Sequence, residues 1–247
     1  MDRLLFRGAK ALFFLALLLS SSWTRAENAA PIVFIAPLND SMPLARFENE
    51  VLAGGIIKDL GDAIAARMGL PVRYLSLPSA RISIGLNKGQ ADSLCYVLPQ
   101  WMTGEFYWSK PVIEDAEMIV TRADIPVVHD FADLAGSRVG TVIAYHYPEV
   151  LAALGADFLR DDAQSMELNI RKIVAGRMKY AIVEKLPFDY ALRRDAMPSV
   201  RVDLVYAPFT ARCAFSRRST IPFAAFDKAV DDLIADGTVA RIMAAYK

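Results

Sequence analysis

The amino-acid sequence predicts an α/β protein made of two similar lobes. From Pro31 onward, short apolar runs typical of buried strands alternate with amphipathic helical patterns. The same order restarts near residue 137, and the run "LNKGQADSLCY" in the first half is echoed by "IVAGRMKYAIVE" in the second. This alternation is typical of a mixed, mostly parallel sheet flanked by helices. Two such lobes would face each other across a cleft, a place where ligands commonly bind.

Residues 1–26 have the three-part pattern of a secretory signal peptide. Basic residues in "MDRLLFRGAK" precede the apolar run "ALFFLALLL", and a small and polar stretch follows. The apolar run is shorter than the ~20 residues of a transmembrane helix. We therefore predict cleavage after Ala26, with Ala30 as the alternative site, in preference to an uncleaved anchor. The mature chain is then exported to the periplasm as a soluble protein.

Charge and cysteine content narrow the functional class. The chain has 28 basic and 28 acidic residues, so it lacks the basic excess that indicates nucleic-acid binding. Cys95 and Cys213 are the only cysteines. Two free buried thiols are the simpler interpretation, and a disulfide is the alternative in an oxidising compartment. Together with His129 and His146 they show no metal-ligand spacing, so we predict no metal and no cofactor.

In the first half, an amphipathic helix over 54–69 ends at Gly69, because its apolar residues recur at helical spacing up to that glycine. The strands expected around it are 32–36, 72–77 and 91–98. In the second half, we expect helices over 148–155 and 165–176, the latter capped by Ser165. The strands expected there are 137–144, 156–160 and 179–185.

The C-terminal segment, residues 226–247, predicts two helices interrupted at Asp236-Gly237. The segment is too short to form a lobe of its own. We therefore expect it to pack back on the first lobe.

One helix of the first half carries an unusually placed arginine. Ser79 has the character of a helix N-cap and Gly89 that of a stop, which puts Arg81 in the first turn. A cation at the positive end of a helix dipole is mildly unfavourable. Arg81 is therefore a candidate anion ligand, because a guanidinium beside free backbone N–H groups makes a strong anion site. An exposed surface arginine is the alternative.

Six segments, in order, resemble the type II periplasmic solute-binding proteins of the amino-acid-binding family 3 group. They are "GGIIKDLGDAIAARMGLPVRYL", "LPSARISIGLNKGQADS", "FYWSKPV", "FADLAGSRVGTVIA", "IVAGRMKYAIVE" and "FDKAVDDLIADGTVARI". The resemblance covers almost all of residues 31–247 and implies a Venus-flytrap fold. Lobe 1 would comprise residues 31–117 plus 215–247, and lobe 2 residues 118–210. Two crossing strands would form the hinge on which the lobes close.

The resemblance also implies site residues. Arg81 would contact a ligand carboxylate, as in relatives with a Pro-x-x-Arg helix start. Glu184 would hold a ligand ammonium, at a place where the family typically has an aspartate. The family binds carboxylates at the junction "AYHYPEV", but this chain has Tyr145 and His146 there, which suit a flat or larger ligand. The alternatives are packing roles for these two residues and a rim ion pair between Glu184 and Lys185.

One segment departs from the family pattern. The usual arginine, in a Thr-x-x-Arg pattern after the strand, anchors the α-carboxylate of an amino acid, but "YVLPQWMTGEFYWS" has Trp101 and no arginine. Either Arg81 takes over this role or the ligand is not an ordinary amino acid. Phe47, Tyr96 and Trp101 are expected at loop ends facing the cleft, where one or two of them would stack on the ligand. Core packing is the alternative for each.

Two functions remain open at this point. The first is a non-catalytic monomer that closes over a small amino-acid-like or carboxylate ligand and delivers it to an inner-membrane ABC permease, with a sensory binding protein as a variant. The second is an exported enzyme on the same fold, similar to cyclohexadienyl dehydratases, with Glu184 as general acid and Arg81 as carboxylate clamp. We favour the binding protein, because the sequence offers no second acid–base residue. It also has no nucleophile elbow, phosphate loop or metal-protease helix.

Overall fold

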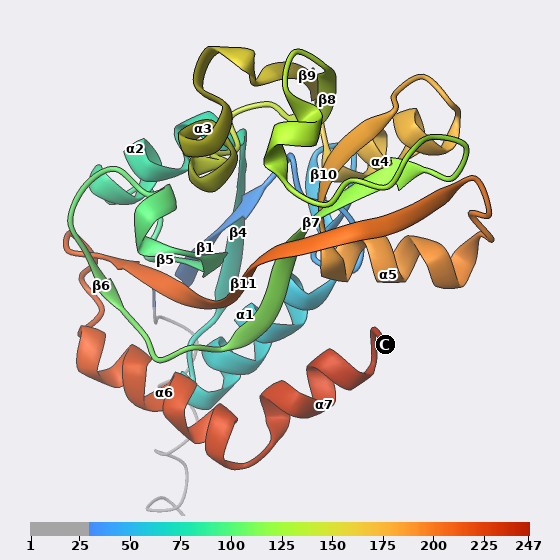
Figure 1. The fold of residues 1–247 in the computed structure, drawn as a ribbon. Helices are drawn as coiled ribbons and strands as arrows, with labels where there is room; N and C mark the ends of the chain where they lie inside the picture. The colour runs from blue at the N-terminus through green and yellow to red at the C-terminus, as the bar shows by residue number, and fades with distance from the viewer. Residues whose placement is uncertain (1–29) are drawn as a thin grey trace, which may run out of the picture.

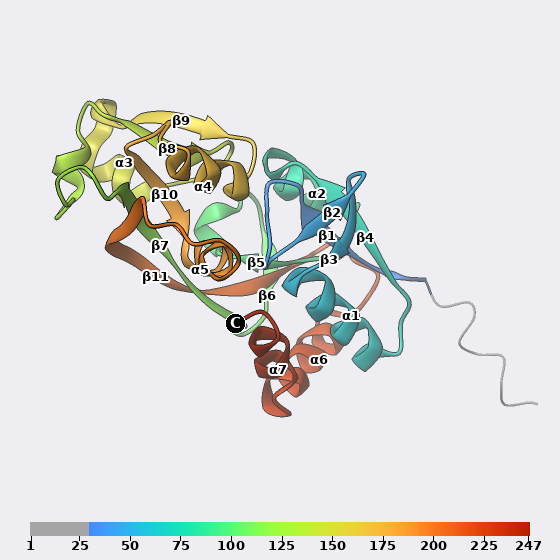
Figure 2. The ribbon, with the colours of Figure 1, turned by 90° about the vertical axis from the view of Figure 1, so that its right-hand side faces the viewer.

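The computed structural model describes residues 30–247, so the predicted signal peptide lies outside the described residues. Two groups of strands, each covered by helices, are joined by two long strands that run side by side between them (Figures 1 and 2). We call the group that begins the chain lobe 1 and the other lobe 2. We propose residues 31–117 plus 215–247 and residues 118–210 as their limits.

The strands form one continuous mixed sheet. Lobe 1 contributes β1 (Ile32–Pro37), β4 (Val72–Leu77), β5 (Ser93–Val97) and β6 (Phe106–Trp108). Lobe 2 contributes β8 (Arg138–Val142), β9 (Leu159–Ala163) and β10 (Tyr180–Glu184). The connecting strands are β7 (Ile113–Arg122) and β11 (Val200–Ser216). The order is β4-β1-β5-β11-β7-β10-β8-β9, with β6 also paired to β11. A separate hairpin joins β2 (Arg46–Glu48) to β3 (Val51–Gly54).

The helices of lobe 1 include the one predicted over residues 54–69 and the two predicted at the C-terminus. They are α1 (Ile56–Met68), α2 (Ile82–Asn87), α6 (Phe223–Ala235) and α7 (Thr238–Ala244). Gly69 ends α1 in the left-handed conformation, as its position predicts. The two C-terminal helices pack beside α1 (Figure 1), and the hydroxyl of Tyr246 donates to Asp59 of α1 at 2.7 Å. The C-terminal segment thus belongs to lobe 1.

Lobe 2 contains α3 (Pro148–Leu154), α4 (Met166–Val174) and α5 (Lys185–Arg194). The Ser165 hydroxyl caps α4 by accepting from the Leu168 N–H, as predicted. The sequence analysis does not predict α5. Pro187 lies in its first turn, where a helix needs no N–H donor and tolerates proline.

Side chains alternate between two core clusters in each lobe. On β1, Ile32 and Phe34 face one cluster, and Val33 and Ile35 face the other. This period of two, with both faces buried, is typical of a sheet covered by helices on both sides. Among residues 30–247, no helix combines the length and apolar character needed to cross a bilayer.

The predicted cap at Ser79 is wrong. Residues Ser79–Arg81 form a separate 3-10 turn that follows Pro78, and the Ser79 side chain makes no capping bond. Instead the backbone N–H of Ser79 donates to the Asn39 side-chain oxygen at 2.8 Å. A residue distant in sequence therefore satisfies this N–H, which a local pattern does not reveal.

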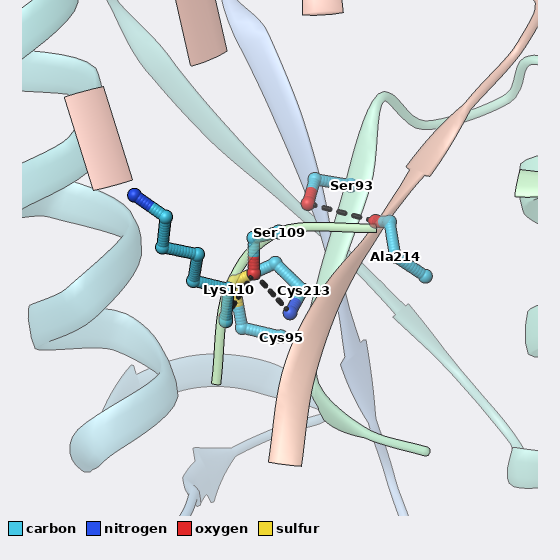
Figure 3. The surroundings of a disulfide bond; sticks show 6 residues. All are labelled: Ser93, Cys95, Ser109, Lys110, Cys213 and Ala214. Atoms are coloured by element: carbon cyan, nitrogen blue, oxygen red, sulfur yellow. Dashed lines mark hydrogen bonds between the residues drawn. A yellow bond between two sulfur atoms is a disulfide. The ribbon is translucent and has the colours of Figure 1, made fainter. Parts of the chain in front are cut away.

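Cys95 and Cys213 form a disulfide, so the simpler interpretation of two free thiols is wrong (Figure 3). The two residues lie directly opposite each other on the antiparallel strands β5 and β11. Both are buried, and the Ser109 hydroxyl accepts from the Cys213 N–H at 3.0 Å. The bond joins residues 118 positions apart and ties the connecting strand β11 to lobe 1.

Candidate functional site

A cavity of about 490 Å³ lies between the two lobes. Its volume is within the range of small-molecule sites. It lies at the carboxyl ends of strands from both lobes, where open α/β sheets bind ligands. The lining comprises Pro37, Asp40, Ser79, Ala80, Ile82, Ser83, Ile84, Leu94, Tyr96, Val97, Trp101, Thr103, Glu117, Ala144, Tyr145, His146 and Glu184.

Five of the seven residues singled out from the sequence line this cavity, and two do not. Those in the lining are Tyr96, Trp101, Tyr145, His146 and Glu184. Arg81 is exposed and outside the lining, although Ala80 and Ile82 on either side of it belong to it. Phe47 is half-buried and packs against the lobe 1 core. The carboxylate clamp at Arg81 stays a prediction, because the position of this exposed side chain alone does not test contact with a ligand.

Glu184 ends β10 and immediately precedes α5, so the strand carries its carboxylate to the edge of the sheet. The residue is only 3 % exposed, and its Oε2 atom has no hydrogen-bond partner. The side chain of Lys185 pairs with Asp189 one turn along α5. The alternative of a rim ion pair between Glu184 and Lys185 is therefore not realised.

Three more buried carboxyl groups surround Glu184. Glu117 on β7 is its register partner, Asp115 lies two residues before Glu117, and Asp40 lies in the loop after β1. Burial raises the pKa of Glu184 well above its usual range, and the charges of Asp115, Asp40 and Glu117 raise it further. Among residues 30–247, no three acidic, histidine or cysteine side chains are arranged to hold a metal ion.

The neighbouring carboxyls are perturbed in the same direction. Burial raises the pKa of Asp40 and the pKa of Glu117 to about 7 each, and that of Asp115 to about 6. These shifts favour the neutral forms, because charged carboxylates in an apolar setting lose their hydration. The described residues of the site therefore supply no positive charge strong enough to keep these carboxyls ionised.

The hydrogen-bond donors that reach these carboxyls are neutral. Hydroxyl groups of three tyrosines donate to them: Tyr145 to Asp40 at 2.9 Å, Tyr206 to Glu117 and Tyr96 to Asp115. The second oxygen of Asp40, Oδ2, is buried without a partner, as Oε2 of Glu184 is. Within the described part of the chain, the lining includes no lysine and no arginine.

Contacts between the lobes border the cavity. The side chain of Asn39 donates to the Gln164 carbonyl at 2.8 Å, and its backbone carbonyl accepts from the Met166 N–H. The bond from Tyr145 to Asp40 also crosses the cleft. These contacts join the loop after β1 to the start of α4 and to the segment after β8.

Two residues of the cavity lining have an unusual, strained backbone conformation. Tyr96 and Ala144 both adopt left-handed φ angles, 65° and 63°, and both line the cavity. Such conformations are uncommon for residues other than glycine and concentrate at functional sites. The indole of Trp101 packs edge-on against Phe209, with ring centroids 5.1 Å apart, which fixes its orientation.

The sequence analysis missed Asp40, Asp115 and Glu117. The run "IEDAEMIV" places the latter two among apolar residues of strand β7, beside the exposed Glu114, and that pattern could have indicated them. Asp40 sits in a polar loop where an acidic residue is unremarkable by sequence. Only the fold brings it to Glu184.

Comparison with known proteins identifies the family. The family model for bacterial extracellular solute-binding proteins, family 3, matches residues 35–247. A search of curated proteins found no match. The fold of the chain is similar to that of many solved structures.

Three of these structures are examples of the proteins that share the fold. A histidine kinase sensor domain with similarity to periplasmic binding proteins has a TM-score of 0.74 at 21% identity, covering 88% of this chain and 96% of that chain. A periplasmic binding protein of Salmonella typhimurium has a TM-score of 0.71 at 16% identity, covering 88% and 99%. The periplasmic VFT2 domain of Bordetella pertussis BvgS has a TM-score of 0.70 at 19% identity, covering 88% and 93%. With two lobes, a cavity between them and this family match, the chain belongs to the bacterial extracellular solute-binding proteins, family 3.

Proposed function

We propose that this protein is a periplasmic, non-catalytic binding protein that closes over a small solute bearing an amino or guanidinium group. Glu184 carries this proposal: it is a buried carboxyl group at the cavity whose Oε2 has no partner among the described residues. Burial keeps such a group neutral, whereas a cation that enters with the ligand supplies the charge and the N–H donors that let it ionise. The solute would then be delivered to an inner-membrane ABC permease.

The rest of the cavity supports the same ligand. Tyr96, Trp101 and Tyr145 give it an aromatic wall, and such rings attract cations over their faces. The Salmonella typhimurium relative is described as highly specific for arginine, and another similar structure is an ancestral arginine-binding protein bound to arginine. Arginine carries a guanidinium group, so these similarities favour a cationic ligand here.

The test is ligand binding by the mature chain after unfolding and refolding, which strips any ligand carried through purification. Thermal melting and calorimetry against amino acids, amines and dicarboxylates should show stabilisation by compounds with an amine or guanidinium. Glu184→Gln should abolish that stabilisation. Glu114→Gln, on the exposed face of β7, is the matched control and should keep it. Binding of dicarboxylates alone, or unchanged binding by Glu184→Gln, would contradict the proposal.

A second candidate is catalysis on the same fold. The raised pKa of Glu184 favours its protonated form, which is the form a general acid needs. Against it, Arg81 is exposed and outside the cavity lining, a position that does not favour the clamp expected for a cyclohexadienyl acid. Turnover of prephenate or arogenate that is lost in Glu184→Gln would favour the enzyme over the binding protein.

Similarity to a histidine kinase sensor domain also supports a sensory role. Uptake of labelled ligand by cells with and without the gene distinguishes delivery to a permease from sensing. Uptake that depends on the gene favours delivery to a permease, and unchanged uptake favours sensing.

A further inference from the structure

Building on the proposed function, we infer that the ligand is an organic cation without a carboxylate group, with two positive charges that engage the two lobes separately. The chemical class is a diamine or a guanidino-amine. The argument rests on what the cavity offers to an anion, on where its unpartnered oxygens lie, and on its walls.

The cavity offers a ligand carboxylate no lysine or arginine. In the described part of the chain none lines it, and Arg81 is exposed outside it. Two backbone donors nearby are already engaged. The Ser79 N–H donates to Asn39, and the Leu186 N–H at the start of α5 donates to Asp115.

A ligand carboxylate would also meet three acidic groups. Asp40, Glu117 and Glu184 all line the cavity, and each is at least nine-tenths buried. A further negative charge among them is disfavoured, because none of them can ionise beside it without like-charge repulsion. An α-carboxylate is therefore selected against, while an amine is selected for.

Two unpartnered oxygens lie on different lobes. Oδ2 of Asp40 belongs to the loop after β1 in lobe 1, and Oε2 of Glu184 belongs to the end of β10 in lobe 2. Both residues line the cavity, at 8 % and 3 % exposure. A ligand with a cation at each end pairs with both, which also holds the lobes together.

The walls fit a chain with an apolar middle. Ile82, Ile84 and Leu94 contribute aliphatic surface, and Tyr96 and Trp101 contribute aromatic surface. Methylene groups between two cations pack against such walls while the charged ends reach the carboxylates. A single-charge ligand leaves one of the two oxygens unpaired.

Calorimetry with matched pairs tests the inference. The pairs are ornithine and putrescine, lysine and cadaverine, and arginine and agmatine, in which the second member lacks only the carboxylate. We expect the decarboxylated member of the best pair to bind about tenfold more tightly or better, because it brings no negative charge into a site already lined by three buried acids. Asp40→Asn should weaken binding of cadaverine by about tenfold while changing binding of pentylamine little, since only the diamine uses both oxygens. Glu114→Gln again serves as the control.

The outcomes are distinguishable. If the amino acids bind as tightly as their amines, the inference is overturned while the proposed function stands. If pentylamine binds as tightly as cadaverine, or Asp40→Asn weakens both equally, the two-charge part is overturned. If no amine or amino acid binds the refolded protein, both proposals fail together.

Discussion

Two buried carboxyl side chains of lobe 2, on strands β11 and β10 with β7 between them, differ in the partners that the chain gives them. The Asp203 side chain on β11 is 2 % exposed, pairs with Arg201 at 2.6 Å, and accepts from the Thr121 hydroxyl and the Val128 N–H at 2.7 Å each. Burial raises the pKa of Asp203, but these donors outweigh burial and hold it below its usual range. Glu184 is also buried, no lysine or arginine among residues 30–247 pairs with it, and burial and its acidic neighbours raise its pKa.

This contrast indicates where the missing partner comes from. At Asp203 the chain supplies a counter-ion two residues away, so the charge is neutralised by folding alone. At the cavity the chain supplies tyrosine hydroxyls and further acids. Without a counter-ion, buried carboxyl groups favour the neutral form. In the free protein the cavity acids therefore stay mostly uncharged, and a cationic ligand would supply the counter-ion that lets them ionise on binding.

The largest expected effect is on ligand binding by Glu184→Gln. Loss of the charged partner of a buried ligand cation should weaken binding of the best amine by about 100-fold, measured by calorimetry. The free energy of unfolding without ligand should stay the same or rise, because a buried carboxyl with raised pKa is removed. Normal binding by Glu184→Gln would show that the Glu184 carboxyl, like that of Asp203, does not serve ligand binding.

Asp203→Asn should do the reverse. It breaks the pair with Arg201 inside the protein, so the free energy of unfolding should fall by about 2 kcal/mol in urea titrations. Affinity of the folded protein for the amine should be unchanged, because Asp203 is not part of the cavity lining. An unaltered urea midpoint would show that the Arg201 pair contributes little.

The two sites should also respond oppositely to pH. Asp40, Glu117 and Asp115 have pKa values of about 7, 7 and 6, above their unfolded values, and Glu184 is raised as well. Their contribution to stability is full below the unfolded pKa values and is lost as pH rises through the folded ones. The ligand-free protein should therefore melt at a lower temperature near pH 8 than near pH 5.

The contribution of Asp203 has the opposite sign. Because its pKa is lowered, its stabilisation is present above the unfolded value and is lost only as pH falls through the folded pKa, in the more acidic range. The change between about pH 5 and pH 8 thus reports the cavity. Stabilisation by an amine should grow over the same interval, as the carboxyls become charged. Equal stabilisation at both ends would contradict the assignment.

The smallest effect is expected from Tyr145→Phe. It removes the hydroxyl that donates to Asp40 across the cleft, one neutral hydrogen bond worth about 1 kcal/mol, so ligand affinity should fall several-fold. Tyr107→Phe is the control, because Tyr107 is 43% exposed and stacks on Phe223, away from the cavity. Equal effects of the two variants would show that the cross-cleft bond is irrelevant to binding.

Much of the architecture could be predicted from local patterns. Helix α1 ends at Gly69 and helix α4 is capped by Ser165, because capping depends on residues a few positions apart. Glu184 could be singled out because a carboxylate at the end of an apolar strand lies at the sheet edge. By the same logic Ser79 was expected to cap a helix, but a distant residue, Asn39, satisfies its N–H instead.

Short-range spacing was enough to predict the alternation of strands and helices, the two-lobed fold class, and several aromatic residues and Glu184 at the candidate site. The disulfide between Cys95 and Cys213, the place of Arg81 outside the cavity lining, and the approach of Asp40 and Glu117 to Glu184 became known only from the fold. These are contacts between residues far apart in the chain. Their energies depend on burial and on which charges meet, quantities that exist only once both lobes are assembled.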